Sequence, residues 1–469
     1  MIHDVGYSPP RTGLDLQRRY AHLLAADPAS ARGLTDAATN SELLRVGYGN
    51  GFLPAPVFLT GEERRRLAED LTTVYALLRA LPERLFGGDH RRFAAAVGMT
   101  PTQIEVSTRT GTGGLEPLGR ADLYRTQDGF QLLELNITSA LGGFENAEIN
   151  RAMLAHPALR EFIETHGLSS VDTLAGIVAV LRRDCAPFLT RDRPVVALVD
   201  WPDSYPTYGP RLGVWARMLT AFGLDAVPCH VGHLEADAGS LRIAGRRVDV
   251  VFRFFLTEEI ATPADFAMVS PILDAAERGT VGLFCRMDAE LYGNKGALAL
   301  LSDEESRDAF SAAELTCLDR FLPWTRPVRR GLVCDPRGDL VDLCAFAVEH
   351  QDQLILKPTL LHGGSGIVPG WTVARDRWQA ALEEAVSAPG WVLQQRVRPV
   401  AEPFYDPDRD EVRDFFLNWG VFLVSTETTG SDGYGGCIVR GSPSPDVGVV
   451  SMREGARVGC CFHESVVFG

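Results

Sequence analysis

The chain has 469 residues, a formal net charge of −15 at pH 7, 45% hydrophobic residues and 23% charged residues. The length predicts more than one domain, and the composition is typical of a globular protein rather than a disordered or fibrous one. The negative charge argues against nucleic acid as a partner. Only two of the 46 Lys and Arg residues are lysines, Lys295 and Lys357. Because lysine is a compact charge on a flexible stem, these positions are candidates for a phosphate site in which arginine would not serve.

The beginning of the sequence, MIHDVGYSPPRTG, is polar and lacks the apolar core of a signal peptide. The clearest apolar helix, around residues 174–181, is far too short to span a bilayer. We therefore expect a cytoplasmic protein with no membrane partner. The nine cysteines show neither a CxxC pair nor a zinc-like spacing to histidine, so reduced thiols are expected.

Residues 1–103 are predicted to form a helical N-terminal region. Apolar side chains recur at helical spacing over residues 62–81, and Thr60 is a suitable N-cap for this helix. From about Ile104 the pattern changes, and strands are expected there.

The most informative segment is residues 120–136, RADLYRTQDGFQLLELN. A three-residue loop at 127–129, closed by Gly129 in a left-handed conformation, predicts a β-hairpin in which Thr126 faces Phe130. One face of this hairpin carries polar side chains, and the other is dominated by leucines. The pattern therefore predicts that the leucines pack on the core while the polar face lines a cleft.

Two acidic residues oppose each other on the polar face. The register places Asp122 opposite Glu134 and Arg120 opposite Asn136. Like charges directly opposed across a sheet destabilise it unless something neutralises them. Asp, Glu and Asn oxygens are hard ligands of the kind that Mg²⁺ prefers. We therefore predict a metal site at Asp122, Glu134 and Asn136; the alternative is an exposed hairpin edge with solvated charges.

Residues 190–285 alternate between strands and helices. A helix is predicted at 211–223, and apolar segments predict three buried strands, at residues 194–200, 224–230 and 248–255. This alternation predicts a parallel, Rossmann-like sheet, and ligands bind at the carboxyl ends of the strands in such sheets. No GxGxxG follows the first strand, so a dinucleotide site is not supported.

Residues 286–469 are predicted to mix helices and strands. Helices are expected at 310–321 and 376–388, and strands at 354–358, 391–397, 421–424 and 435–440. The expected architecture of the whole chain is therefore α/β together with α+β, in which this C-terminal part and the hairpin form one catalytic module.

Lys357 ends a predicted strand and is followed by a glycine-rich loop, Gly363, Gly364, Ser365 and Gly366. Backbone N–H groups of such a loop can cradle a phosphate, although the spacing is not that of a P-loop. Lys295 leads into a predicted helix, so its ammonium group could face the same cleft. Gln394 and Gln395 lie on an apolar strand whose backbone could hold a purine; the alternative is that these glutamines face solvent.

In these motifs the chain resembles the ATP-grasp ligases, most closely the circularly permuted glutathionylspermidine synthetase-like group. The resemblance spans about residues 115–440. It rests on an ordered set of residues: Arg120-x-Asp122, Glu134-x-Asn136, Asn294-Lys295, Lys357 with HGGSG, Gln394–Gln395 and Arg440. In an ordinary ATP-grasp enzyme the metal-binding E-x-N follows the nucleotide lysines. Here it precedes them, which implies the permuted order.

The resemblance implies an ATP-grasp fold whose strands with metal ligands lie in 104–170. A pre-ATP-grasp-like domain would occupy 190–285, and the nucleotide-binding lobes 286–469. It also implies a role for each motif: two Mg²⁺ ions and ATP held by Asp122, Glu134 and Asn136, phosphate and purine-side contacts from Lys295 and Lys357, an adenine hinge at Gln394–Gln395, and stabilisation of the transferring phosphate by Arg120 and Arg440.

The implied reaction joins a small carboxylate to an amine, both of amino-acid or peptide type, through an acyl phosphate, with ADP and phosphate as products. A peptide-like specialised metabolite is the expected kind of product. Two alternatives stay open: a small-molecule kinase on the same scaffold and a non-catalytic nucleotide-binding protein. Arg253 and Arg286 could each bind a substrate carboxylate or form a structural ion pair. The sequence does not indicate an oligomeric state.

Overall fold

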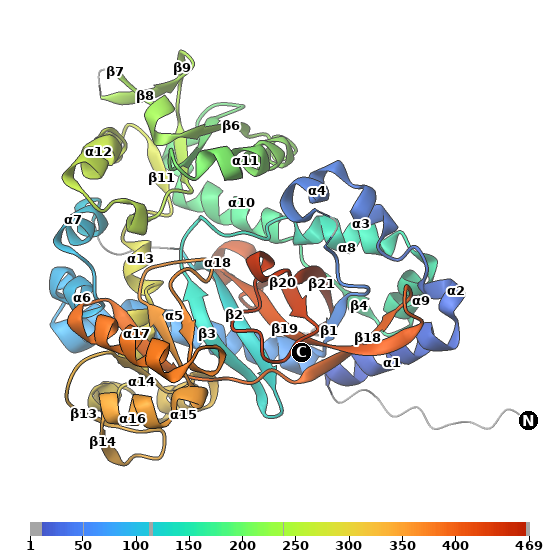
Figure 1. The fold of residues 1–469 in the computed structure, drawn as a ribbon. Helices are drawn as coiled ribbons and strands as arrows, with labels where there is room; N and C mark the ends of the chain where they lie inside the picture. Colours follow the sequence, from blue (N-terminus) through green and yellow to red (C-terminus); the bar gives the residue numbers. More distant parts are fainter. Residues whose placement is uncertain (1–11, 50, 112–115, 238, 466–469) are drawn as a thin grey trace, which may run out of the picture.

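Figure 1 shows the computed structural model of the chain, which describes residues 12–49, 51–111, 116–237 and 239–465. Its centre is an eight-stranded sheet. The strands are β1 (Val57–Leu59), β2 (Leu118–Thr126), β3 (Gly129–Asn136), β4 (Leu168–Ser169), β18 (Ala401–Asp406), β19 (Glu411–Val424), β20 (Tyr434–Ser442) and β21 (Arg457–Glu464). The main order is β1-β21-β20-β19-β2-β3, with β18 paired to β19 and β4 to β21. The sheet therefore joins the predicted hairpin, β2–β3, to strands from the far end of the chain.

The N-terminal residues form the predicted helices, but β1 interrupts them. The helices are α1 (Gly13–Ala26), α2 (Pro28–Ala31), α3 (Asp36–Asn40), α4 (Glu42–Tyr48), α5 (Gly61–Phe86), α6 (His90–Ala96) and α7 (Pro101–Arg109). Thr60 caps α5 as predicted, because its hydroxyl and the Glu63 carboxylate each accept from the other residue's backbone N–H. The expected strands from residue 104 are wrong. A capping box at Thr100 starts α7 instead, and the first hairpin strand begins only at Leu118.

The parallel sheet predicted in the middle of the chain is confirmed. After α8 (Asn146–Leu154), α9 (Pro157–Thr165) and α10 (Thr173–Asp184), the chain forms β5 (Val195–Asp200), β6 (Asp225–His230), β10 (Val250–Arg253) and β11 (Gly282–Phe284). Their order is β11-β10-β5-β6, and all neighbours are parallel. Strands β7 (Glu235–Asp237), β8 (Ser240–Ile243) and β9 (Arg246–Arg247) form a small sheet beside it, at the top of Figure 1.

Helices cover both faces of this parallel sheet. Helix α11 (Tyr205–Thr220) belongs to the apolar cluster that contains Val196 and Leu198. Helix α12 (Pro263–Glu277) belongs to the cluster that contains Ala197 and Val199. Since alternate residues of β5 point to opposite faces of the sheet, the two helices lie on opposite sides. The carboxyl end of β5 is left free to border a cavity.

A third sheet carries the second predicted lysine. It contains β12 (Thr325–Pro327), β17 (Trp391–Gln395), β15 (Leu354–Pro358) and β16 (Val368–Pro369), in that order and antiparallel. Other elements of this part are α13 (Ala289–Tyr292), α14 (Lys295–Ser302), α15 (Ala312–Phe321), β13 (Leu332–Cys334), β14 (Leu340–Asp342), α16 (Leu343–Glu349), α17 (Arg375–Ser387) and α18 (Thr426–Thr429). The helices predicted at 310–321 and 376–388 are thus confirmed as α15 and α17.

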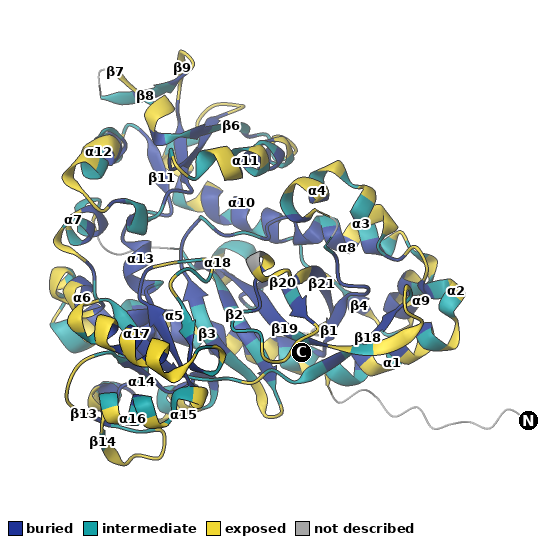
Figure 2. Ribbon diagram, in the orientation of Figure 1, coloured by how far each residue is buried: buried dark blue, intermediate teal, exposed yellow. Residues whose placement is uncertain are grey.

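Burial follows these layers. Figure 2 shows the strands of the central and parallel sheets as mostly buried, whereas the hairpin β13–β14 is largely exposed. All nine cysteines are free thiols, as predicted. None of the described helices combines the length and the apolar composition that a bilayer span requires.

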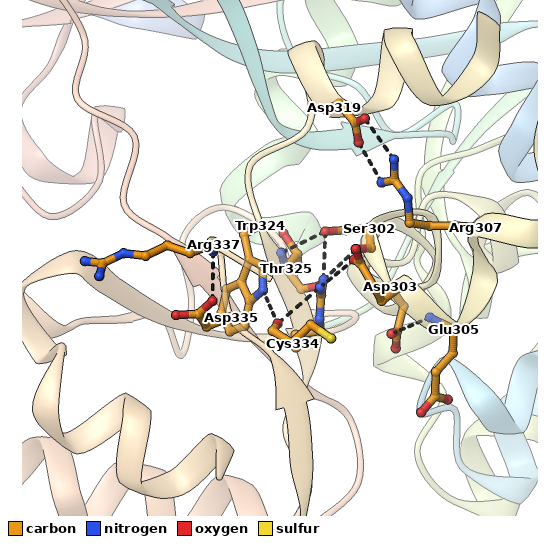
Figure 3. Close-up of polar contacts among 12 residues, drawn as sticks. Ser302, Asp303, Glu305, Arg307, Asp319, Trp324, Thr325, Cys334, Asp335 and Arg337 are labelled. Atoms are coloured by element: carbon orange, nitrogen blue, oxygen red, sulfur yellow. Dashed lines mark hydrogen bonds and ion pairs between the residues drawn. The ribbon is translucent and has the colours of Figure 1, made fainter. Parts of the chain in front are cut away.

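A buried arginine holds α14 to the third sheet. Arg326 on β12 donates to the backbone and hydroxyl oxygens of Ser302, at the end of α14, and to the carbonyl of Cys334 at 3.4 Å. Trp324 donates to the same carbonyl at 2.9 Å. Figure 3 shows Ser302, Thr325 and Cys334 converging here, with Arg337 pointing away. The network fixes α14, and with it Lys295, relative to β17.

We expect Arg326→Met to lower the free energy of unfolding by about 1–3 kcal/mol, because it leaves several buried acceptors without a donor. Arg337→Met, at an exposed position of the β13–β14 turn, is the matched control and should change it by less than about 0.5 kcal/mol. Urea unfolding of both variants measures the difference. Equal effects of the two substitutions would contradict the role given to Arg326.

Candidate active site

A cavity of about 650 Å³ lies where the hairpin, the parallel sheet and the third sheet meet. Most of the predicted site residues line it: Arg120, Asp122, Glu134, Asn136, Lys357, Gly363, Gly364, Ser365, Gln394, Gln395 and Arg440. Lys295 and Gly366 are the two that do not line it directly. Residues more than 300 positions apart in the sequence therefore share one cavity.

The hairpin has the predicted register at its acidic end and a different one at its turn. Asp122 pairs with Glu134 and Arg120 with Asn136, as expected. Thr126, however, pairs with Gly129 and not with Phe130, so the loop is a two-residue turn. A β-bulge next to Asp122 restores the register, because Leu123 pairs with Leu132 and the extra residue is Leu133.

The bulge has a consequence for the third sheet. The carbonyl oxygen of Leu133 accepts from Lys357 Nζ at 3.4 Å and from Gln394 Nε2 at 3.5 Å. Lys357 Nζ also donates to Gln394 Oε1 at 2.7 Å. Since a bulged residue is left out of the ladder, its carbonyl is free to accept from side chains of another sheet. Gln394, one of the two glutamines, is therefore buried beside Lys357 and does not face solvent.

The paired carboxylates are neutralised by cations from three elements. Asp122 accepts from Arg120 Nε at 3.2 Å and from Arg440 Nη2, on β20, at 2.8 Å. Glu134 lies 3.2 Å from Lys295 Nζ, which also donates to the carbonyl of Leu361 at 2.8 Å. The predicted need for a neutralising charge is thus met by side chains, and Lys295 is connected to the cavity through Glu134.

These cations keep the carboxylates ionised. Burial acts to raise the pKa of Asp122, but Arg120 and Arg440 outweigh it and the pKa lies below its usual value. Burial also acts to raise the pKa of Glu134, and Lys295 is the largest of the opposing charges that bring this pKa below its usual value. Ionised carboxylates and the Asn136 amide on one face of a hairpin have the donor chemistry that Mg²⁺ requires. Metal binding by these residues stays a prediction.

Sequence reasoning missed a side-chain contact that holds the glycine-rich loop. His362 Nδ1 lies 2.6 Å from Glu258 Oε2, on the 3₁₀ helix η3 (Thr257–Glu259) that follows β10. The pair connects the loop to the parallel-sheet domain across the cavity. The signal in the sequence was the pair of glutamates after the strand, and the partner histidine is 104 residues away.

The two arginines with open roles are structural. Arg253 is fully buried, forms an ion pair with Glu290 and donates to the carbonyls of Phe255 and Cys285 at 2.8 Å each. Arg286 pairs with Asp288 at 3.1 Å. Neither arginine lines the cavity, so the interpretation as substrate ligands is not supported.

No known family model matches the sequence, and no curated protein matches it. Among solved structures, a glutathione synthetase-like effector from Globodera pallida has a similar fold. It shares 12% identity, the match covers 97% of this chain and 99% of that chain, and the TM-score is 0.55. The two chains therefore share a mixed α/β fold over nearly their whole lengths. A candidate γ-glutamylcysteine synthetase from Methylobacillus flagellatus matches over 83% of this chain and 86% of its own, with 10% identity and a TM-score of 0.41, too low to support an argument.

We expect the ammonium group of Lys357 to titrate with a midpoint near pH 8. Burial lowers the pKa of Lys357 to about 8, against the opposing charge of Glu134, whereas an ordinary lysine has a pKa of about 10.4. Because the chain has two lysines, selective ¹³C labelling of lysine gives two side-chain NMR signals, and Lys357→Arg assigns them. A Lys357 signal that stays charged beyond pH 10 would contradict this environment.

Proposed function

We propose that the chain is an ATP-dependent carboxylate–amine ligase, which forms an amide bond through an acyl phosphate and releases ADP and phosphate. The observation that carries the proposal is the single cavity in which an acid pair with Asn136 faces Lys357, Gln394 and the glycine-rich loop. These are the groups needed to hold a nucleotide with its metal ions. The fold shared with a glutathione synthetase-like protein agrees with it.

The proposal includes the circularly permuted order of the glutathionylspermidine synthetase-like group. Residues 104–170 would supply the strands with metal ligands, 190–285 the pre-ATP-grasp-like domain and 286–469 the nucleotide lobes. This division is supported by the chain order, in which β2–β3 precede the lysine strand β15, and by the pairing of β2 with the late strand β19.

The nucleotide would lie against the third sheet. Lys357 and Gln394 hold each other and the Leu133 carbonyl, so that the ammonium group is fixed at the cavity wall. The strand carrying Gln394 and Gln395 offers backbone groups to a purine, and the loop at 363–366 offers N–H groups to phosphate. Lys295 would add to the positive charge near the phosphates from its position beside Glu134.

Asp122, Glu134 and Asn136 would hold the Mg²⁺ ions. When bound, the ions would offset negative charge on the phosphoryl oxygens. Arg120 and Arg440 both contact Asp122, one from its own strand and one from β20, and they would stabilise the transferring phosphoryl group from this position. Mg²⁺ and these arginines would share the carboxylate of Asp122.

The substrate carboxylate would attack the γ-phosphate, and the amine would then displace phosphate from the acyl group. An acyl phosphate hydrolyses in water, so the site must exclude solvent. The His362–Glu258 contact holds the glycine-rich loop against the parallel-sheet domain and would close this side of the cavity.

An ATP-hydrolysis screen against amino acids and amines, with mass spectrometry of the products, tests the proposal. A new amide together with ADP and free phosphate is the expected result. A phosphate ester would favour the kinase alternative, and ATP binding without turnover would favour a nucleotide-binding protein. The absence of binding heat with ATP and Mg²⁺ would overturn all three.

Glu134→Gln is expected to lower kcat by about 100-fold or more, because it removes a charged metal ligand whose role is to stabilise the transferring phosphate. Glu161→Gln, an exposed residue outside the cavity, is the control and should leave kcat unchanged. Steady-state phosphate release measures both. Full turnover by Glu134→Gln at ordinary Mg²⁺ concentration would show that the metal assignment is wrong.

Lys357→Arg and Lys295→Arg are each expected to weaken ATP binding by about tenfold or more, since a planar fork does not replace a compact ammonium group. In the wild type, ATP affinity should fall as pH rises through about 8, because Lys357 loses its proton there. Calorimetry over a pH series measures both effects. Arg377→Lys, at an exposed position, is the control, and normal ATP affinity in both lysine variants would contradict the assignment.

A further inference from the structure

The wall of the cavity that the parallel-sheet domain forms carries three acidic residues. Asp200, Glu258 and Glu259 line it, together with Ser204. Asp200 ends β5, and the two glutamates lie in η3, which begins four residues after the end of β10. Strand β5 lies between β6 and β10. From β5 the chain continues to β6 on one side of it and later returns to form β10 on the other side. Ligands of open α/β sheets bind in the crevice at such a reversal of strand order.

Asp200 has one carboxylate oxygen that is satisfied and one that is not. Oδ1 accepts from the backbone N–H of Trp201 at 2.9 Å and from Ser204 Oγ at 2.8 Å. Oδ2 is buried, and within the part of the chain that the structure describes it has no hydrogen-bond partner. The residue is only 5% exposed. A buried acceptor without a partner costs free energy unless a ligand supplies the donor.

Glu259 shares this environment. Its Oε2 accepts from the backbone N–H of Leu256 at 2.7 Å. Burial raises the pKa of Glu259 to about 8, and the charge of Asp200 adds to the effect. Burial also raises the pKa of Asp200. Glu258 differs from both, because its Oε2 lies 2.6 Å from His362 Nδ1. Among the described residues, no ion pair involves Asp200 or Glu259, so this wall of the cavity has uncompensated acceptors.

We propose that Asp200 and Glu259 form a subsite for an ammonium group of the substrate, which donates to Oδ2 of Asp200. The inference rests on the proposed ligase function and specifies its substrate class: a molecule with a protonated amino group that does not react. The walls formed by the central sheet and the third sheet carry Arg440 and Lys357 and suit an anion. The cavity as a whole therefore suits a substrate that carries a positive charge in addition to its reacting group.

An ammonium group of this kind belongs either to an α-amino acid that supplies the carboxylate or to a diamine that supplies the amine. Calorimetry of the full chain with two matched pairs of probes distinguishes the sources. L-alanine carries an ammonium group where L-lactate carries a hydroxyl. In the same way, 1,4-diaminobutane has a second ammonium group where 4-amino-1-butanol has a hydroxyl. The subsite predicts that the ammonium member of one pair binds at least about tenfold more tightly. Equal affinities, or no binding, in both pairs would overturn it.

Asp200→Asn locates the effect. The amide keeps an oxygen for Trp201 and Ser204 but loses the charge, so the preference for the ammonium probe should disappear. Asp203→Asn, three residues further along and exposed, is the matched control and should keep the preference. A preference that survives in Asp200→Asn would overturn the assignment. If a variant fails to fold, the comparison of probes on the wild-type protein still tests the subsite.

The probe titrations are made without ATP, and ATP binding is titrated separately. If the ligase proposal is wrong, the protein will not bind ATP but will still prefer the ammonium probes. Failure of the subsite would appear as normal ATP binding with no preference between the members of either pair.

Discussion

The candidate site depends on one electrostatic constraint, the two carboxylates opposed on neighbouring strands of a hairpin. Asp122 and Glu134 are held in a cavity wall, where like charges repel strongly unless cations stand between or beside them. The cations come from three elements: Arg120 on the same strand, Arg440 on β20 and Lys295 at the start of α14. Because these partners are far apart in the sequence, neutralising the acid pair also connects the hairpin to β20 of the central sheet and to α14, which Lys295 begins.

The bulge in β3 connects this hairpin to the third sheet. The extra residue Leu133 has a carbonyl oxygen that accepts from Lys357 and Gln394 of that sheet. The geometry of the acid pair is unchanged, because the shift begins on the side toward the turn. One inserted residue therefore serves as an acceptor for the neighbouring sheet without moving the charges of the hairpin.

Local sequence patterns predicted many of the helices and strands, whereas contacts between residues far apart in the sequence determined the features that were missed. Spacing and capping predicted α5 with its N-cap Thr60, the parallel sheet and the pairing of Asp122 with Glu134, since these depend on neighbours in the sequence. The bulge was missed because a two-residue turn and a three-residue loop fit the same residues. The pair of His362 with Glu258 was missed because nothing local links two residues 104 positions apart. The roles of the site residues toward ATP and metal remain predictions.

The two lysines stand where the acceptors suit an ammonium group. Lys295 meets Glu134 and the carbonyl of Leu361, and Lys357 meets Gln394 and the carbonyl of Leu133. Each ammonium group has three donors, two of which these contacts can use. A guanidinium group would bring five donors in a rigid plane into the same buried space, and most of them would lack an acceptor there. This mismatch supplies a physical reason for lysine at 295 and 357 in a chain that otherwise uses arginine.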